Sequence, residues 1–176
     1  MYLISIYFDE KTNKIIEQYI KQVARETGNT FMLDAKVPPH ITISGFETAE
    51  EQKVVDMLTE EVSKFQQGKL QWVTVGAFLP YVIYIAPVLN EHLHNISCAI
   101  YSGLQKVPDV SISNYYRPFQ WLPHTTIGKK LAKGQLKAAF EVMQNNFGVF
   151  EGMVTKVGLA KTNPYRDVAV FEVTKR

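Results

Sequence analysis

The sequence has little of several features that define common protein classes. A single cysteine, Cys98, occurs in 176 residues, so no internal disulfide can form, and a secreted fold held together by disulfides is excluded. No apolar run approaches the roughly 20 residues that a membrane-spanning helix needs. The segment 1–14, MYLISIYFDEKTNK, has no basic stretch before its short apolar run, which indicates a first strand and not a signal peptide. We therefore expect a cytoplasmic protein without a membrane partner.

Positive charge is also sparse. The formal net charge is +2, and no run of consecutive Lys or Arg is longer than two residues, as at Lys129 and Lys130. A protein that holds long duplex nucleic acid by charge alone needs a dense basic face, so this class is excluded, whereas a ligand with a single phosphate is compatible. The composition is 46% apolar, which is typical of a folded domain with a substantial core.

Hydrophobic periodicity predicts strands and helices that alternate along the chain. The spacing of Ile16, Ile20 and Val23 predicts a helix that ends near Gly28, and the segment 31–39 is expected to be extended. The other predicted elements are a strand at 2–9, a helix with a capping box at Thr48 to Glu51, a hairpin of strands at 70–78 and 81–88, a helix at 90–107, a loop or irregular strand at 108–121, a helix marked by Leu136, Phe140, Met143 and Phe147, and a strand pair at 152–162 and 167–173.

Two short segments repeat one pattern: residues 40–43 read HITI, residues 124–127 read HTTI, and each follows a proline. Residues i and i+2 of a strand project from the same face, so the histidine and the threonine of each segment point together. The alternate residues face the other way, toward the helices. Thr125 lies on that apolar face and needs a hydrogen-bond partner if it is buried. The four residues on the shared face are His40, Thr42, His124 and Thr126.

The chain repeats its plan around these segments. Each one is followed by a helix and two strands, and Gly76 follows His40 by 36 residues while Gly158 follows His124 by 34. Equal order and similar spacing predict two similar lobes related by an approximate two-fold axis. We expect one bilobal α+β domain over residues 1–176, with two pseudo-symmetric lobes of antiparallel sheet, helices packed outside and a central cleft.

Two histidines and two threonines around one cleft suit a transfer at phosphorus. An imidazole with a pKa near ~6.5 is a neutral base or a charged acid near neutral pH, so a pair can deprotonate the attacking oxygen and protonate the leaving one. The threonine hydroxyls can donate to the non-bridging phosphate oxygens. A single such histidine would more simply be structural, but the matched pair favours a reaction site.

The two His-x-Thr segments, 84 residues apart, resemble the paired motifs of the two-histidine (2H) phosphoesterase superfamily, which includes the LigT-like 2′-5′ RNA ligases and RNA 2′,3′-cyclic phosphodiesterases. The resemblance covers nearly the whole chain. It implies a bilobal fold and cleavage of cyclic or linear phosphodiesters of RNA ends or small nucleotides, with no metal or other cofactor. It also implies that His40 and His124 are the catalytic pair and that Thr42 and Thr126 hold the phosphate.

Residues around the second motif are further candidate contacts. LigT-like members often carry arginine three residues after the second threonine; Lys129 stands there and keeps the charge without the fork geometry. The segment 115–121, YYRPFQW, either offers a stacking surface for a base or packs along the edge of the cleft. Within it, Tyr116 and Arg117 are favoured as substrate contacts.

Other polar residues have weaker claims. His92 and His94 lie about 200° apart on a helix, and His94 with Cys98 gives only two ligands, fewer than a zinc site requires. We interpret these residues as structural or solvated, and we place Tyr81, Lys161 and Tyr165 as candidates for the rim of the cleft.

Two further functions stay open at this point. One is a non-catalytic module that binds a phosphorylated nucleotide or RNA end in the same cleft. The other is an RNA 2′-5′ ligase, which joins ends through the same transition state. In each case the expected partner is an RNA end or small nucleotide, and we expect a monomer.

Overall fold

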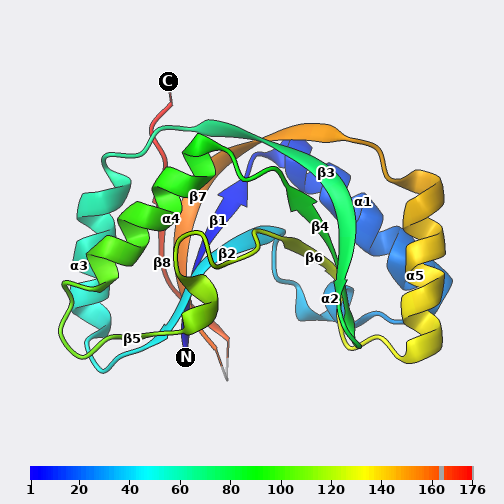
Figure 1. Ribbon diagram of the computed structural model, residues 1–176, viewed down its shortest axis with the longest axis horizontal. Helices are drawn as coiled ribbons and strands as arrows, with labels where there is room; N and C mark the ends of the chain where they lie inside the picture. Colours follow the sequence, from blue (N-terminus) through cyan, green and yellow to red (C-terminus); the bar gives the residue numbers. More distant parts are fainter. Residues whose placement is uncertain (163–164, 176) are drawn as a thin grey trace.

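One twisted antiparallel sheet runs through the whole molecule. The computed structural model describes residues 1–162 and 165–175. In this part of the chain, eight strands form a sheet in the order β5-β2-β1-β7-β3-β4-β6, and β8 pairs with β7. The sheet bends into an arch, with α3 and α4 outside one end and α1 and α5 outside the other (Figure 1). The predicted α+β class with antiparallel strands and outer helices is confirmed.

The elements have the following bounds. The strands are β1 (Tyr2–Phe8), β2 (His40–Glu47), β3 (Gly68–Phe78), β4 (Val82–Pro87), β5 (Ser111–Ile112), β6 (Thr125–Gly128), β7 (Phe150–Lys161) and β8 (Arg166–Glu172). The helices are α1 (Glu10–Thr27), α2 (Phe31–Ala35), α3 (Glu51–Val62), α4 (Glu91–Leu104) and α5 (Lys133–Asn146), with a 3₁₀ turn η1 (Asn114–Tyr116). Within residues 1–162 and 165–175, no helix is both long and apolar enough to cross a membrane.

The first helix follows its sequence signals. The Asp9 side chain accepts a hydrogen bond from the Thr12 amide at the N-terminus of α1, and Gly28 ends the helix in the left-handed conformation with a φ of 70°. An aspartate N-cap and a glycine C′ residue are the expected helix boundaries. The predicted apolar face, including Ile16 and Val23, is buried.

The segment after α1 was expected to be extended, and this expectation is wrong. Residues Phe31–Ala35 form the short helix α2. Asn29 Oδ1 accepts from the Phe31 amide at 3.1 Å, and Thr30 Oγ1 donates to Asp34 at 2.7 Å. These local side-chain bonds stabilise a helical turn that periodicity over so few residues does not reveal.

The predicted capping box at Thr48 to Glu51 does not form. Thr48 Oγ1 accepts instead from the Glu50 amide at 2.9 Å, and α3 begins at Glu51 without a side-chain cap. The Glu51 carboxylate is used elsewhere, since Arg166 donates to it at 2.7 Å and the Tyr2 hydroxyl at 3.0 Å. A contact to β8, far away in the sequence, replaces the local one.

Two other predicted helices also differ from the structure. Helix α4 ends at Leu104, three residues before the predicted end at 107. In α5, Phe140 is exposed and Phe147 lies just after the helix, so the buried side is formed by Leu136, Ala139, Val142 and Met143. The segment 108–121 is irregular as expected and contains only the two-residue strand β5 and the turn η1.

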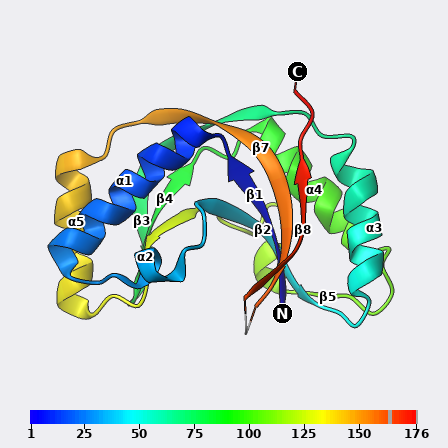
Figure 2. The same ribbon diagram turned by 180° about the vertical axis from the view of Figure 1, so that it is seen from behind.

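The repeat is real, but its two halves interlock. The equivalent units are β1-α1-β2-α3-β3 and β4-α4-β6-α5-β7. In each unit the last strand leaves its own partners: β3 pairs with β4, and β7 pairs with β1. Figures 1 and 2 show the result, a first lobe of β5, β2, β1, β7 and β8 under α3 and α4, and a second lobe of β3, β4 and β6 under α1 and α5.

Strand β7 joins the two lobes. Its first residues, 150–154, pair with β3, and residues 154–161 pair with β1. At this junction the Trp72 ring stacks on Phe150 at 4.9 Å between centroids, and Phe8 meets it edge-on at 5.0 Å. Trp72 is fully buried, and its Nε1–H donates to Thr125 Oγ1 at 3.3 Å. The partner predicted for a buried Thr125 is therefore present.

Thr125→Val tests this buried hydrogen bond. The substitution keeps the shape of the side chain but leaves the indole N–H of Trp72 without an acceptor, and we expect the free energy of unfolding to fall by about 1–3 kcal/mol. Thr74→Val, at an exposed position of β3, is the matched control and should change it by less than about 0.5 kcal/mol. Denaturant unfolding measures both, and equal midpoints for the two variants would contradict the expectation.

Candidate active site

Each motif lies at the beginning of a strand of the sheet. Strand β2 begins at His40 and β6 begins at Thr125, one residue after His124. The inward residues Ile41, Ile43 and Thr125 are at most 1% exposed. The histidines and the motif threonines are only half-buried, on the opposite face. The alternation predicted for both segments is confirmed.

Both imidazoles are held in the same way. His40 Nδ1 lies 2.8 Å from the carbonyl oxygen of Pro38, and His124 Nδ1 lies 2.9 Å from that of Leu122. A carbonyl only accepts, so Nδ1 carries the proton in each neutral ring and Nε2 is left as the basic nitrogen. In each case the acceptor carbonyl belongs to the residue two positions before the histidine, and a proline stands between these two residues. The two rings are therefore oriented by equivalent backbone bonds.

Burial lowers the pKa of both histidines. Burial lowers the pKa of His40 from its ordinary 6.5, the bond to Pro38 opposes this, and the positive charges of His124 and Lys129 lower it further. Burial also lowers the pKa of His124, against the bond to Leu122. Strands β2 and β6 of the two motifs contact each other, which agrees with the effect of the His124 charge on the pKa of His40. Lys129, from the second motif, acts on the same histidine.

Aromatic rings pack around the histidines, and glycines make room for them. The Tyr7 ring lies 6.1 Å from His40, and the Tyr84 ring lies 5.3 Å from His124, between centroids. A Cβ atom at Gly158 would lie 2.6 Å from the Tyr7 ring, and one at Gly76 would lie 2.5 Å from the Tyr84 ring. Gly76 and Gly158, which mark equivalent positions of the repeat, therefore each leave room for a tyrosine ring beside one of the histidines. Phe78 adds an edge-on contact to His124 at 4.7 Å.

The motif threonines lie beside the histidines on the same face. Ser5 Oγ donates to Thr42 Oγ1 at 3.5 Å, so the hydroxyl proton of Thr42 stays available to another acceptor. Thr126 is opposite Tyr84 in the β4–β6 pair. Ser5 and Tyr7 were not among the predicted site residues. Both occupy alternate positions of β1, next to the motif strand, and this polar alternation is the signal that would have indicated them.

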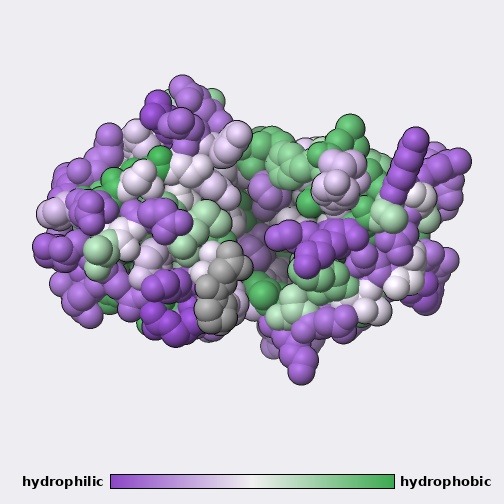
Figure 3. Space-filling model, turned by 90° about the horizontal axis from the view of Figure 1, so that it is seen from below, coloured by the Kyte–Doolittle hydropathy of each residue, from purple (hydrophilic) through white to green (hydrophobic). Residues whose placement is uncertain are grey.

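Only some of the residues predicted as aromatic or basic substrate contacts lie beside His124. A pocket of about 450 Å³ beside His124 is lined by Phe78, Tyr115, Tyr116, Gln120, Trp121, Leu122 and His124 itself; we call it the aromatic pocket. Tyr116 lies in it, with its ring against Gly45 of β2. Arg117 and Lys129 are exposed and do not line it. Figure 3 shows the underside of the molecule, hollowed between the two lobes, with hydrophilic surface in the hollow and a hydrophobic patch beside it.

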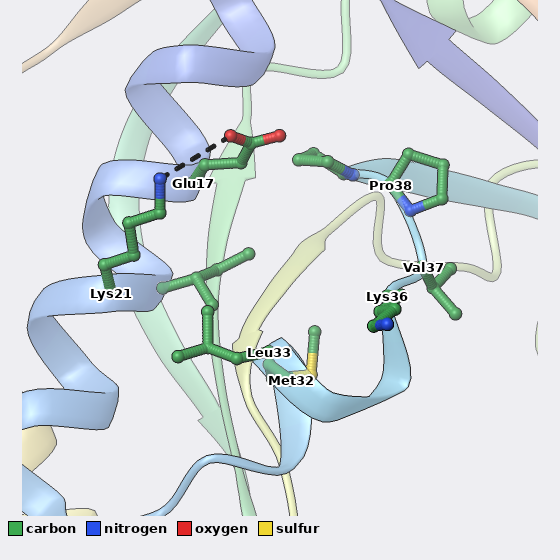
Figure 4. Close-up of a pocket in the computed structure, with 9 residues that line it drawn as sticks. Glu17, Lys21, Met32, Leu33, Lys36, Val37 and Pro38 are labelled. Carbon is green, nitrogen blue, oxygen red and sulfur yellow. Dashed lines mark ion pairs between the residues drawn. The ribbon is translucent and has the colours of Figure 1, made fainter.

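Two other features lie apart from the paired motifs. A pocket of about 280 Å³ between α1 and α2 has Met32, Leu33 and the ion pair of Glu17 with Lys21 on its walls, and Pro38 closes it toward β2 (Figure 4). His94 Nε2 lies 3.3 Å from Cys98 Sγ. The described residues include no group of three or more His, Cys, Asp or Glu side chains that could hold a metal ion.

Fold and motifs together define a two-histidine phosphoesterase architecture. The family model of the 2′-5′ RNA ligase superfamily matches residues 14–166, so this chain belongs to that superfamily. TT0787 of Thermus thermophilus has a TM-score of 0.67 at 12% identity, over 99% of this chain and 98% of that chain. E. coli LigT complexed with 3′-AMP has a TM-score of 0.59 at 18% identity, over 98% and 97%. These likenesses show the fold. A search of curated proteins gives no match.

Alanine at the two ring-facing glycines is expected to be destabilising. Gly76→Ala and Gly158→Ala each place a methyl group against a tyrosine ring, which should lower the free energy of unfolding by about 1–3 kcal/mol. Gly134→Ala is the matched control, because no atom lies within 4 Å of a Cβ there and the position is in the helix α5. It should change the free energy of unfolding by less than about 0.5 kcal/mol. Thermal unfolding measures the three variants, and a destabilised Gly134→Ala with unaffected sheet variants would contradict this account.

Proposed function

We propose that this protein is a metal-independent phosphoesterase that hydrolyses a 2′,3′-cyclic phosphate of an RNA end or nucleotide, or a related 2′-5′ phosphodiester. The observation that carries the proposal is the equivalent fixation of His40 and His124, each by Nδ1 on a backbone carbonyl. This arrangement leaves Nε2 of both rings as the proton-transfer atom. Two such atoms, acting on one phosphate, supply the acid and the base that the reaction needs.

The proposed reaction uses the two histidines in opposite protonation states. The neutral ring takes a proton from water at Nε2 as the water oxygen attacks phosphorus, and the protonated ring gives its Nε2 proton to the departing sugar oxygen. The bond to water oxygen forms, the bond to the sugar oxygen breaks, and the proton count is unchanged. Thr42 and Thr126 donate to the non-bridging oxygens, whose charge must be stabilised in the transition state.

Substrate contacts around this centre are proposed from the aromatic pocket and the nearby cations. Tyr116 offers a ring for a nucleobase, since aromatic stacking tolerates any base. Lys129 lowers the pKa of His40 through its charge, which supports a place close enough to attract a phosphate. Arg117 directly follows Tyr116 in the sequence and is exposed. It is proposed to contact the phosphate backbone of a longer substrate. The likeness to LigT, which was crystallised with 3′-AMP and with ATP, supports a nucleotide ligand.

Substitution of the histidines tests the proposal directly. With adenosine 2′,3′-cyclic phosphate and EDTA present, His40→Ala and His124→Ala are each expected to lower kcat/KM by on the order of 10²–10⁴, because each removes one proton transfer. His92→Gln, a histidine outside the two motifs that lies against Gly68 of β3, should leave the rate unchanged. Tight binding of the cyclic phosphate by the native chain without any turnover would favour a non-catalytic binding module, and joining of RNA ends without hydrolysis would favour a ligase.

The pH dependence gives a second test. Below both histidine pKa values no base is present, and above both no acid is present, so kcat/KM should be bell-shaped. Burial lowers both values from 6.5, and we therefore expect the maximum on the acidic side of pH 6.5. Lys129→Gln removes a charge that lowers the pKa of His40 and should move the profile toward higher pH, whereas Lys11→Gln should not. An optimum well above pH 7 would contradict the proposed pair.

A further inference from the structure

The strand of the second motif has fewer restraints than that of the first. Strand β6 has four residues, Thr125–Gly128, and lies at the end of the sheet, where it pairs with β4 alone in the part of the chain that the structure describes (Figure 1). This pairing is irregular between Ile83 and Tyr84. Strand β2, in contrast, has eight residues and pairs with both β1 and β5. The ladder alone therefore holds His124 less firmly than His40.

Trp72 restrains β6 from the buried side of the sheet. Its indole Nε1–H donates to Thr125 Oγ1 at 3.3 Å, and both residues are at most 1% exposed. Trp72 is opposite Pro87 in the β3–β4 pair, and Thr125 is opposite Ile85 in the β4–β6 pair. The indole thus reaches across β4, a span of two strand spacings or roughly 10 Å. Because Thr125 directly follows His124, the bond holds the second motif from behind.

The indole is itself held by strands of both lobes. Its ring stacks on Phe150 of β7 at 4.9 Å and meets Phe8 of β1 edge-on at 5.0 Å, between centroids. A Cβ atom at Gly152 of β7 would lie 2.9 Å from the same ring, so the backbone approaches it closely there. Phe8 ends β1, the strand that pairs with β2 of the first motif. One side chain therefore connects the neighbouring strand of the first motif with the second motif.

The first motif has an apolar residue at the position equivalent to Thr125. This residue, Ile41, is fully buried and is opposite Ile6 in the β1–β2 pair. An apolar contact has no preferred direction, whereas a hydrogen bond has a preferred distance and angle. Replacing both partners of a buried hydrogen bond by apolar groups of the same shape can be nearly neutral for stability, so stability alone does not explain the polar pair. A defined position of β6 does.

We propose that Trp72 is a positioning residue of the reaction, which acts by holding Thr125. In this role it sets the distance from His124 to His40. The inference rests on the proposed function, because the two histidines must act on one phosphate. The carbonyl of Leu122 orients the His124 ring, whereas Trp72 determines where the strand after that ring lies. A displacement of about 1 Å can cost on the order of 10²-fold in rate, so a shifted β6 would slow the reaction in a folded protein.

Removal of the donor and of the acceptor tests this role. Trp72→Phe and Thr125→Val each remove the bond, and each is expected to lower kcat on adenosine 2′,3′-cyclic phosphate by on the order of 10-fold, with a smaller change in KM. The double variant should be no slower than the slower single variant, because both substitutions act on one bond. Thr125→Ser keeps the acceptor oxygen and should retain most of the rate.

A control variant separates position from stability. Val54→Ala, in the buried face of α3, should lower the denaturant midpoint and leave kcat unchanged at a temperature where circular dichroism shows every variant folded. Wild-type kcat in Trp72→Phe and Thr125→Val, with lowered midpoints, would overturn the proposal and leave the bond a purely structural one. Additive losses in the double variant, or equal losses in Thr125→Ser and Thr125→Val, would also overturn it.

A measurement without turnover keeps this inference apart from the proposed function. If the wild type hydrolyses neither the cyclic phosphate nor a 2′-5′ phosphodiester, the proposed function fails. The chain has four histidines, and their ring-proton NMR signals can be assigned by substitution. Thr125→Val should shift the signals of His124 and leave those of His94 in place, whereas Val54→Ala should shift neither. Unshifted His124 signals in Thr125→Val would contradict a positioning role of Trp72.

Discussion

The division of β7 between two partners determines the geometry of the molecule. Its first residues pair with β3 of one lobe and its later residues pair with β1 of the other, so one strand, with a register shift at Tyr7 and Phe8 of β1, connects the sheet of both lobes. Strand β2, which begins at His40, pairs with β1 of this ladder, and β6, which directly follows His124, pairs with β4, the neighbour of β3. The stacked rings of Trp72 and Phe150 pack together where the two lobes meet. The separation of the two imidazoles is therefore a property of the sheet and not of a flexible linker.

Much of this arrangement was predictable because it depends on short-range patterns. The same-face placement of His40 and Thr42 follows from the period of a strand, and the first helix follows from its apolar spacing and Gly28. The need of Thr125 for a partner was evident from its place on an apolar face. The partner itself, the indole of Trp72, was not, because 53 residues separate the two in the chain.

Each error has its own physical cause. Helix α2 is stabilised by side-chain bonds of Asn29 and Thr30 that a hydrophobic pattern does not record. The capping box failed because Glu51 is drawn to Arg166 on β8. The repeat predicted two lobes, but the exchange of β3 and β7 between them is a choice of strand partners, which spacing alone does not specify. Among the candidate contacts, Tyr116 lines the aromatic pocket together with His124, whereas Arg117 is exposed and does not line it.

The fixation of each histidine by a carbonyl two residues earlier has an evolutionary consequence. No neighbouring side chain is needed to choose the tautomer or aim the ring, since the backbone does both. The residues that line the aromatic pocket can then change over generations while the proton-transfer atoms stay in place. Such a separation lets a lineage change what it binds without first having to rebuild how it reacts.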